Sequence, residues 1–147
     1  SPPEGNSLSL RIFFLGESLC KENTMKIAID IDNTITASKY SVEFFRTLTA
    51  VLISAHQIII ISNREESDRE TTEEELDVLG IRYNKVVLTN DKAGYILKHG
   101  IQFLFEDTDE YLLELPDSVT VFKIRESGNF CFLEHKWIDS AKTVKMI

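Results

Sequence analysis

Short apolar runs alternate with stretches of helical periodicity from residue 25 onward. Residues 27–29 form a brief apolar run, and residues 58–61 are four consecutive isoleucines. A fully apolar, β-branched run of this kind suits a strand buried on both faces of a parallel sheet. We predict five strands, at residues 27–29, 58–61, 86–88, 101–105 and 119–124.

Helix signals lie between these runs. Residues 44–55 place six apolar side chains on the stripe of an amphipathic helix, namely Phe44, Phe45, Leu48, Val51, Leu52 and Ala55. The S-x-x-E sequence at residues 67–70 has the form of a capping box, and Gly80 suits the end of the helix that follows. The apolar face of that helix consists of Thr72, Leu76 and Leu79. Further helices are predicted at residues 91–99, 109–115 and 137–146.

Strands joined by helical segments of this length imply right-handed crossovers and an open parallel sheet with helices on both faces. We therefore predict a three-layer α/β/α domain over residues 25–147. Residues 1–24 are expected to be an N-terminal extension, which is a tag, an upstream-translated segment or an extra strand at residues 8–15.

Composition narrows the classes of partner. The 147 residues are 43% hydrophobic and 27% charged, enough for one buried core, and the net charge of −8 argues against a basic face for duplex DNA or anionic membranes. Cys20 and Cys131 lie far apart, which supports neither a disulfide framework nor a structural zinc site. No apolar run approaches the ~18 residues of a membrane span. We expect a soluble, reduced, cytoplasmic protein with no membrane partner.

Polar residues follow four of the predicted strands. In open α/β sheets, ligands bind beyond the carboxyl ends of the strands, so these residues should meet at one edge. They are Asp30, Asp32, Asn33 and Thr34; Ser62, Asn63 and Arg64; Lys92; and Glu106, Asp107 and Asp109. Each group alone also fits a turn, a helix cap or a solvated lysine. Their ordered coincidence behind four strands points to a site for a divalent metal and phosphate.

These residues resemble the motifs of the haloacid dehalogenase superfamily, in its phosphatase branch. Residues 30–34 (DIDNT) look like the first motif, D-x-D-x-T, and Ser62 looks like the Ser/Thr of the second. Lys92 looks like the lysine of the third motif, and residues 106–107 like the acidic pair of the fourth. The competing Lys85 precedes its strand and would lie at the wrong end of the sheet. The resemblance covers residues 26–121 and implies a Rossmann-like core.

The resemblance also implies a set of roles. Asp30 would attack phosphorus to form an aspartyl-phosphate, and Asp32 would act as general acid and base. Mg²⁺ is the implied cofactor, an ion that prefers oxygen ligands. Its ligands would be Asp30, the Asp32 backbone carbonyl and Asp107. The phosphate-binding residues would be Ser62, Asn63 and Lys92. Glu106 and Thr34 would support the site.

The spacing of the motifs leaves no room for a cap domain. Between Thr34 and Ser62 lie 27 residues, and between Ser62 and Lys92 lie 29, all used by one helix and one strand in each interval. The prediction is therefore a capless phosphomonoester hydrolase with an open site, acting on a small phosphorylated metabolite or nucleotide. The alternatives are a catalytically silent phosphate-binding or protein-interaction module and a phosphatase of phosphoproteins or nucleic-acid ends.

Other features stay open at the level of sequence. Nucleic acid is an unlikely partner except as a phosphate end, and an oligomer is allowed. Arg64 fits the S/T-x-R pattern of nucleotidase and polynucleotide-phosphatase relatives, or an exposed arginine at a helix start. For Asp109, an N-cap is preferred to a place in the site.

Overall fold

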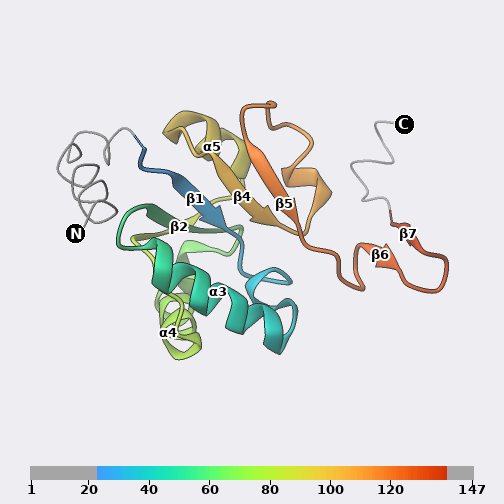
Figure 1. Cartoon of the computed structure of the whole chain (residues 1–147), viewed down its shortest axis with the longest axis horizontal. Helices are drawn as coiled ribbons and strands as arrows, with labels where there is room; N and C mark the ends of the chain where they lie inside the picture. The colour runs from blue at the N-terminus through green and yellow to red at the C-terminus, as the bar shows by residue number, and fades with distance from the viewer. Residues whose placement is uncertain (1–22, 139–147) are drawn as a thin grey trace, which may run out of the picture.

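The computed structural model describes residues 23–138, which contain a five-stranded parallel sheet (Figure 1). Its strands are β1 (Lys26–Ile29), β2 (Gln57–Ser62), β3 (Lys85–Leu88), β4 (Phe103–Glu106) and β5 (Thr120–Lys123). The order across the sheet is β3-β2-β1-β4-β5, and every neighbouring pair is parallel. The α/β class and the five strands are therefore as predicted.

Helices cover both faces of this sheet. On one face lie α3 (Lys39–Leu52) and α4 (Arg69–Leu79), and their apolar residues join those of β1 and β2 in one core cluster. On the other face, α5 (Lys92–His99) packs over a second cluster with the segment that links β4 to β5. The predicted ends of α4 and α5 are confirmed, because Gly80 and Gly100 close these helices with positive φ.

The face that α3 presents to the core differs from the predicted stripe. Phe44 is 54% exposed and Val51 67% exposed, and Ala55 lies beyond the end of the helix. Three residues of the predicted stripe do face the core, since Phe45 is buried and Leu48 and Leu52 are partly buried against it. Thr49, which the pattern left out, is buried as well. Thr49 is tolerated there because its hydroxyl donates to the carbonyl of Phe45 (2.8 Å) and accepts from the amide of Arg82 (3.1 Å). The core-facing side of α3 therefore includes a buried polar residue, Thr49, which a search for apolar residues does not find.

The start of one predicted helix and the length of another are also wrong. Residues 66–68 form a 3₁₀ turn, and α4 begins only at Arg69, without a side-chain cap. The capping box at residues 67–70 is therefore absent, and ion pairs of Arg69 with Glu66 (2.5 Å) and Glu73 (3.4 Å) hold this end instead. The helix predicted at residues 109–115 shrinks to a 3₁₀ turn, Asp109–Tyr111.

A small hairpin follows the sheet, beyond the end of β5 (Figure 1). Its strands, β6 (Phe130–Cys131) and β7 (Lys136–Trp137), pair antiparallel. The terminal helix predicted from residue 137 therefore does not begin there, since Trp137 belongs to β7. The rest of that helix and the extra strand predicted at residues 8–15 lie outside the described residues.

The connections between the strands contain no inserted domain over the part of the chain that the structure describes. Residues 35–61 hold a 3₁₀ turn, α3 and β2, and residues 63–91 hold a 3₁₀ turn, α4 and β3. The prediction of a core without a cap is confirmed for these intervals. Among residues 23–138, no helix is both long enough and apolar enough to cross a membrane.

Candidate active site

The carboxyl ends of four strands meet at one edge of the sheet, as the sequence predicts. Asp30 directly follows β1, and its amide donates to the carbonyl of Phe105 on β4 (3.0 Å). Ser62 is the last residue of β2 and Glu106 the last residue of β4, while Lys92 is the first residue of α5, just after β3. The parallel register of the sheet therefore brings residues 76 positions apart in the sequence into one cluster.

Lys92 is the buried centre of this cluster. Its ammonium donates to a carboxylate oxygen of Asp30 (2.7 Å) and to one of Glu106 (2.7 Å), and all three side chains are buried. The ammonium also lies over the ring of Tyr111, 4.5 Å from the centroid. Burial alone would lower the pKa of Lys92, but the charges of Asp30 and Glu106 outweigh it, so the pKa lies above its usual value. Lys92 is therefore a fixed cation at the base of the site.

Thr34 links Asp30 to a third carboxylate, Asp107. Its hydroxyl lies 2.9 Å from the second oxygen of Asp30 and 3.3 Å from an oxygen of Asp107. Asp30, Glu106 and Asp107 each offer an oxygen within 4.8 Å of the others, a group that could hold a metal ion. Hard carboxylate oxygens are the ligands that Mg²⁺ and Ca²⁺ prefer.

Two acids of this group, Glu106 and Asp107, have raised pKa values. Burial, together with the charge of Asp30, raises the pKa of Glu106 despite the opposing effect of Lys92. Burial also raises the pKa of Asp107 to about 6. Three carboxylates face one ammonium, and a divalent cation would balance the remaining charge.

Asp32 lies outside this buried group and is exposed. Arg64 donates to both carboxylate oxygens of Asp32, through Nη2 (2.8 Å) and Nε (3.1 Å). The remaining guanidinium nitrogen of Arg64 donates to Glu75 (2.7 Å) and to the hydroxyl of Thr72 (3.0 Å), both on α4. Arg64 is thus neither a free surface residue nor a lone helix-start arginine, because it ties the Asp32 carboxylate to α4.

The other two predicted phosphate-binding residues lie at the same edge of the sheet. Ser62 is buried, and its hydroxyl accepts from the amide of Arg64 (3.1 Å), which leaves its own proton to donate elsewhere. Asn63 is exposed, and its amide group donates to the hydroxyl of Tyr111 (2.8 Å). These contacts join the loop after β2 to the turn after β4.

Two of the open alternatives are resolved by the structure. Thr108, and not Asp109, occupies the N-cap position of the 3₁₀ turn, and Asp109 forms an ion pair with Lys123. The preferred N-cap role of Asp109 is therefore wrong. Lys85 is the first residue of β3 and shares a pocket with Lys26 and Gln57 at the opposite edge, where the competing lysine was expected.

Sequence reasoning missed two residues of the site. Tyr111 covers Lys92 and accepts from Asn63. Asn129, which lies just before β6, donates to the carbonyls of Asp107 (2.8 Å) and Ile124 (2.7 Å) and is buried. Neither residue belongs to a strand-end motif. The available signal for Asn129 was a G-N-F sequence, a type common in ordinary turns.

Comparisons with known proteins bear on the fold. No family model matches the chain, and no curated protein sequence matches it. Two similar solved structures are described as the Pnkp1/Rnl/Hen1 complex and the Pnkp1/Rnl/Hen1 RNA repair complex. The first is 17% identical with a TM-score of 0.52, and the alignment covers 71% of this chain and 47% of the matched chain. The second is 20% identical with a TM-score of 0.55, and covers 71% and 43%.

The chain therefore spans less than half the length of the chains that it matches. At this level of identity the likeness concerns the fold. The chain shares an α/β fold with proteins of an RNA repair complex and carries a buried group of three carboxylates that could bind a metal.

Proposed function

We propose that the protein is a Mg²⁺-dependent phosphomonoester hydrolase of the haloacid dehalogenase type, acting through an aspartyl-phosphate. One observation carries the proposal. Asp30 is buried at the end of the central strand and held on one oxygen by Lys92 and on the other by Thr34. A carboxylate fixed in this way beside a cation and a second acid, Asp107, suits in-line attack on a phosphoryl group.

Asp30 supplies the nucleophile. One of its carboxylate oxygens forms a bond to phosphorus while the bond from phosphorus to the ester oxygen breaks. The hydroxyl of Ser62 and the amide group of Asn63 would donate to the phosphoryl oxygens, and Lys92 would offset negative charge at Asp30. Lys92 and Thr34 each donate one hydrogen bond to the carboxylate, so its orientation is set before substrate arrives.

Asp32 moves the proton in both halves of the reaction. It gives a proton to the departing ester oxygen and then takes one from the water that attacks the aspartyl-phosphate. That second attack breaks the bond from phosphorus to Asp30 and releases inorganic phosphate. Because Arg64 holds both oxygens of Asp32 (2.8 and 3.1 Å), the arginine would have to yield part of this grip when Asp32 is protonated.

The residues fit a magnesium ion. The ion would be held by Asp30, Asp107 and the backbone carbonyl of Asp32. Glu106 is better suited to support than to ligation, because Lys92 occupies one of its oxygens and the amides of Asp107 (3.1 Å) and Thr108 (3.2 Å) occupy the other. When bound, the ion supplies charge neutralisation and polarises the phosphoryl oxygen.

The proposed substrate is a small phosphorylated metabolite or nucleotide, reached through a site over which residues 23–138 place no inserted cap domain. A second candidate is a phosphorylated nucleic-acid end. The similar structures from an RNA repair complex favour it, because an uncapped site would also admit the end of a strand. The charge of −8 argues against a long basic track, so contacts beyond the terminal phosphate should be few.

Hydrolysis of a generic aryl phosphate tests the chemistry. We expect activity that requires Mg²⁺, is lost in EDTA and falls at least about 10³-fold in Asp30→Asn. The matched control is Asp117→Asn, an exposed acid that precedes β5 at the opposite edge, which should leave the rate unchanged. Equal rates in Asp30→Asn and the control would overturn the assignment of Asp30 as the nucleophile.

A substrate panel separates the two candidates. Nucleotides, sugar phosphates, phosphopeptides and 3′-phosphate oligonucleotides are compared at equal concentration for kcat/KM. Preference for the first two supports the leading proposal, and preference for the oligonucleotide supports the second candidate. If no member is hydrolysed although phosphate binds, the chain is a silent phosphate-binding module.

A further inference from the structure

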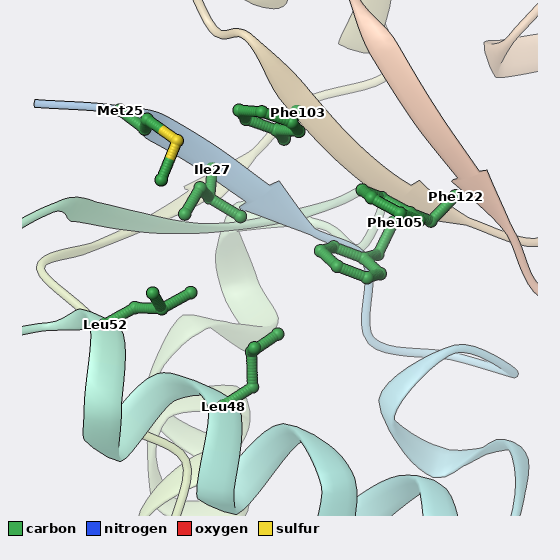
Figure 2. A pocket seen from close by; sticks show the side chains of 7 residues that line it. All are labelled: Met25, Ile27, Leu48, Leu52, Phe103, Phe105 and Phe122. Carbon is green, nitrogen blue, oxygen red and sulfur yellow. The ribbon is translucent and has the colours of Figure 1, made fainter. Parts of the chain in front are cut away.

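An apolar groove runs along the sheet beside α3 (Figure 2). Its lining contains no polar side chain and encloses about 180 Å³. The lining residues are Met25, Ile27, Leu48, Leu52, Phe103, Phe105 and Phe122. In Figure 2, Leu48 and Leu52 point from α3 towards the side chains of the sheet, and an open space separates the two sets.

The groove is open to solvent on the side of β5. Phe122 stacks on Phe105 (centroids 4.6 Å apart) and more loosely on Phe103 (6.3 Å), yet it remains 45% exposed. In Figure 1, α3 and α4 lie below β1 and β2. The core cluster that these helices form with the sheet contains no residue of β5. Parallel sheets are normally covered on both faces, and burial of apolar surface stabilises a fold by roughly 25 cal/mol per Å².

We infer that residues 8–15 of this same chain cover the groove and bury Phe122. Six of these eight residues are apolar, and Ser9 and Arg11 are the exceptions. The segment joins the described chain close to the groove, because Met25, a lining residue, is the third residue after residue 22. The apolar run needs a surface to bury its side chains, and the groove beside its point of attachment is an exposed apolar surface.

The connection is long enough for this docking. Nine residues, 16–24, link the apolar run to Met25. Extended at about 3.3 Å per residue, they reach roughly 30 Å. The groove extends only from Met25, just before β1, to Phe105 and Phe122 near the other ends of β4 and β5. A four-residue strand spans about 13 Å, so the run can lie anywhere along the groove.

The carboxyl-terminal segment fits less well. Residues 139–147 continue from β7, where the ring of Trp137 lies 4.0 Å from the ammonium of Lys123. Side chains alternate along a strand, so Lys123 faces away from the groove that its neighbour Phe122 lines. Residues 139–147 also contain no run of more than two large apolar residues.

Methyl NMR on the full chain tests the inference directly. We expect nuclear Overhauser contacts between methyls of the run, such as Ile12 and Leu15, and those of Met25, Leu48 or Leu52. Contacts of the run with none of these groove methyls would overturn the inference. Contacts seen only between differently labelled copies would also overturn it and would assign the groove to a second copy of the chain.

A pair of full-length variants gives an independent measurement. Ile12→Asp/Phe14→Asp should lower the Tm by several degrees and raise the fluorescence of a dye that binds exposed apolar surface several-fold. The matched control, Ser9→Asp, adds a charge at a polar position of the same run and should change neither. Equal behaviour of the double variant and the control contradicts the inference. Neither readout depends on the proposed hydrolase activity.

Discussion

Three buried carboxylates around one ammonium define the site at the scale of single residues. Asp30 and Glu106 both pair with Lys92, whereas the Asp107 carboxylate accepts from the hydroxyl of Thr34 (3.3 Å). Removing one partner of a buried ion pair costs more than a surface pair is worth, because the remaining charge stays desolvated. The pairing therefore matters for stability as well as for the orientation of Asp30.

Lys92→Met tests the energetic role of this pair. The change leaves two buried carboxylates without their cation, and we expect the free energy of unfolding to fall by about 3–5 kcal/mol. Urea denaturation provides the measurement. Lys98→Met, at an exposed position of the same helix, serves as the control and should change stability by less than about 0.5 kcal/mol.

The double variant Lys92→Met/Glu106→Gln refines this test. Neutralising Glu106 removes one of the two buried carboxylates that Lys92→Met leaves without a cation, so part of the lost stability should return. If the double variant is as unstable as the sum of the two single variants, the direct interaction between Lys92 and Glu106 contributes nothing, since independent sites are additive.

At the scale of elements, the hairpin after β5 supports the loop that carries Asp107. Asn129 donates to two carbonyls, one on Asp107 and one on Ile124, and its own side-chain oxygen accepts from the amide of Glu126 (2.8 Å). Groups that orient metal ligands typically change metal affinity 10- to 100-fold when they are removed. The hairpin is therefore part of the architecture of the site.

Asn129→Ala should weaken the response to magnesium. Because the Asp107 carbonyl loses its donor, the loop shifts, and we expect the Mg²⁺ concentration for half-maximal activity to rise about tenfold or more. Cys131→Ala is the control in the same hairpin, since its thiol donates a long hydrogen bond to the exposed side chain of Glu134 (3.7 Å) and not to the Asp107 loop. A loss of kcat with an unchanged Mg²⁺ midpoint would assign Asn129 a different role.

Two glycines at helix ends give a matched comparison of backbone and packing effects. Gly80 and Gly100 both have positive φ, 75° and 64°, which costs other residues roughly 1–2 kcal/mol. A Cβ at Gly80 would meet Nε of Arg46 at 2.9 Å, whereas at Gly100 nothing lies within 4 Å. Arg46 also donates to the carbonyl of Leu79 (3.0 Å), a bond that the new methyl group would disturb.

We therefore expect Gly80→Ala to destabilise the protein more than Gly100→Ala. The difference should be about 0.5–1.5 kcal/mol, the value of one hydrogen bond. Thermal denaturation of both variants measures it. Equal losses would mean that Arg46 moves aside without cost and that positive φ alone accounts for both effects.

At the scale of the whole molecule, a net charge of −8 and a buried acidic group make cations important in two ways. Any salt reduces the general repulsion among surface charges, whereas a bound divalent ion would act only on the folded site. The two effects separate when ionic strength is held constant.

Mg²⁺ should raise the Tm at constant ionic strength. An ion that binds only the folded chain adds about 2.7 kcal/mol of stability at a concentration 100 times its Kd. NaCl of equal ionic strength is the control, EDTA should reverse the effect, and Asp107→Asn should abolish it. An equal rise with NaCl would point to screening alone.

Much of the architecture could be predicted because its signals are local. The isoleucines of β2, the apolar run of β1 and the glycines that end α4 and α5 each identify an element from neighbouring residues alone. Parallel pairing then brings the polar strand ends together without further information. Asp30, Lys92 and Glu106 are in contact for this reason.

Features that depend on distant partners could not be predicted in the same way. Thr49 is buried on α3 because the amide of Arg82, 33 positions away, needs an acceptor. Asp109 pairs with Lys123 on the neighbouring strand instead of capping its own turn. In each case a polar group contacts a residue that is distant in the sequence, and no local pattern predicts which residue that is.

The α/β class, the five strands and the edge at which acidic and basic side chains collect follow from the amino-acid order alone, because the periodicity of apolar residues and the residues after each run are local properties. The pairing of Arg64 with Asp32, the contact of Asn129 with the Asp107 loop and the apolar groove beside β5 become visible only in the folded chain. These features arise where segments far apart in the chain pack together, and their energy depends on contacts that the sequence order does not contain.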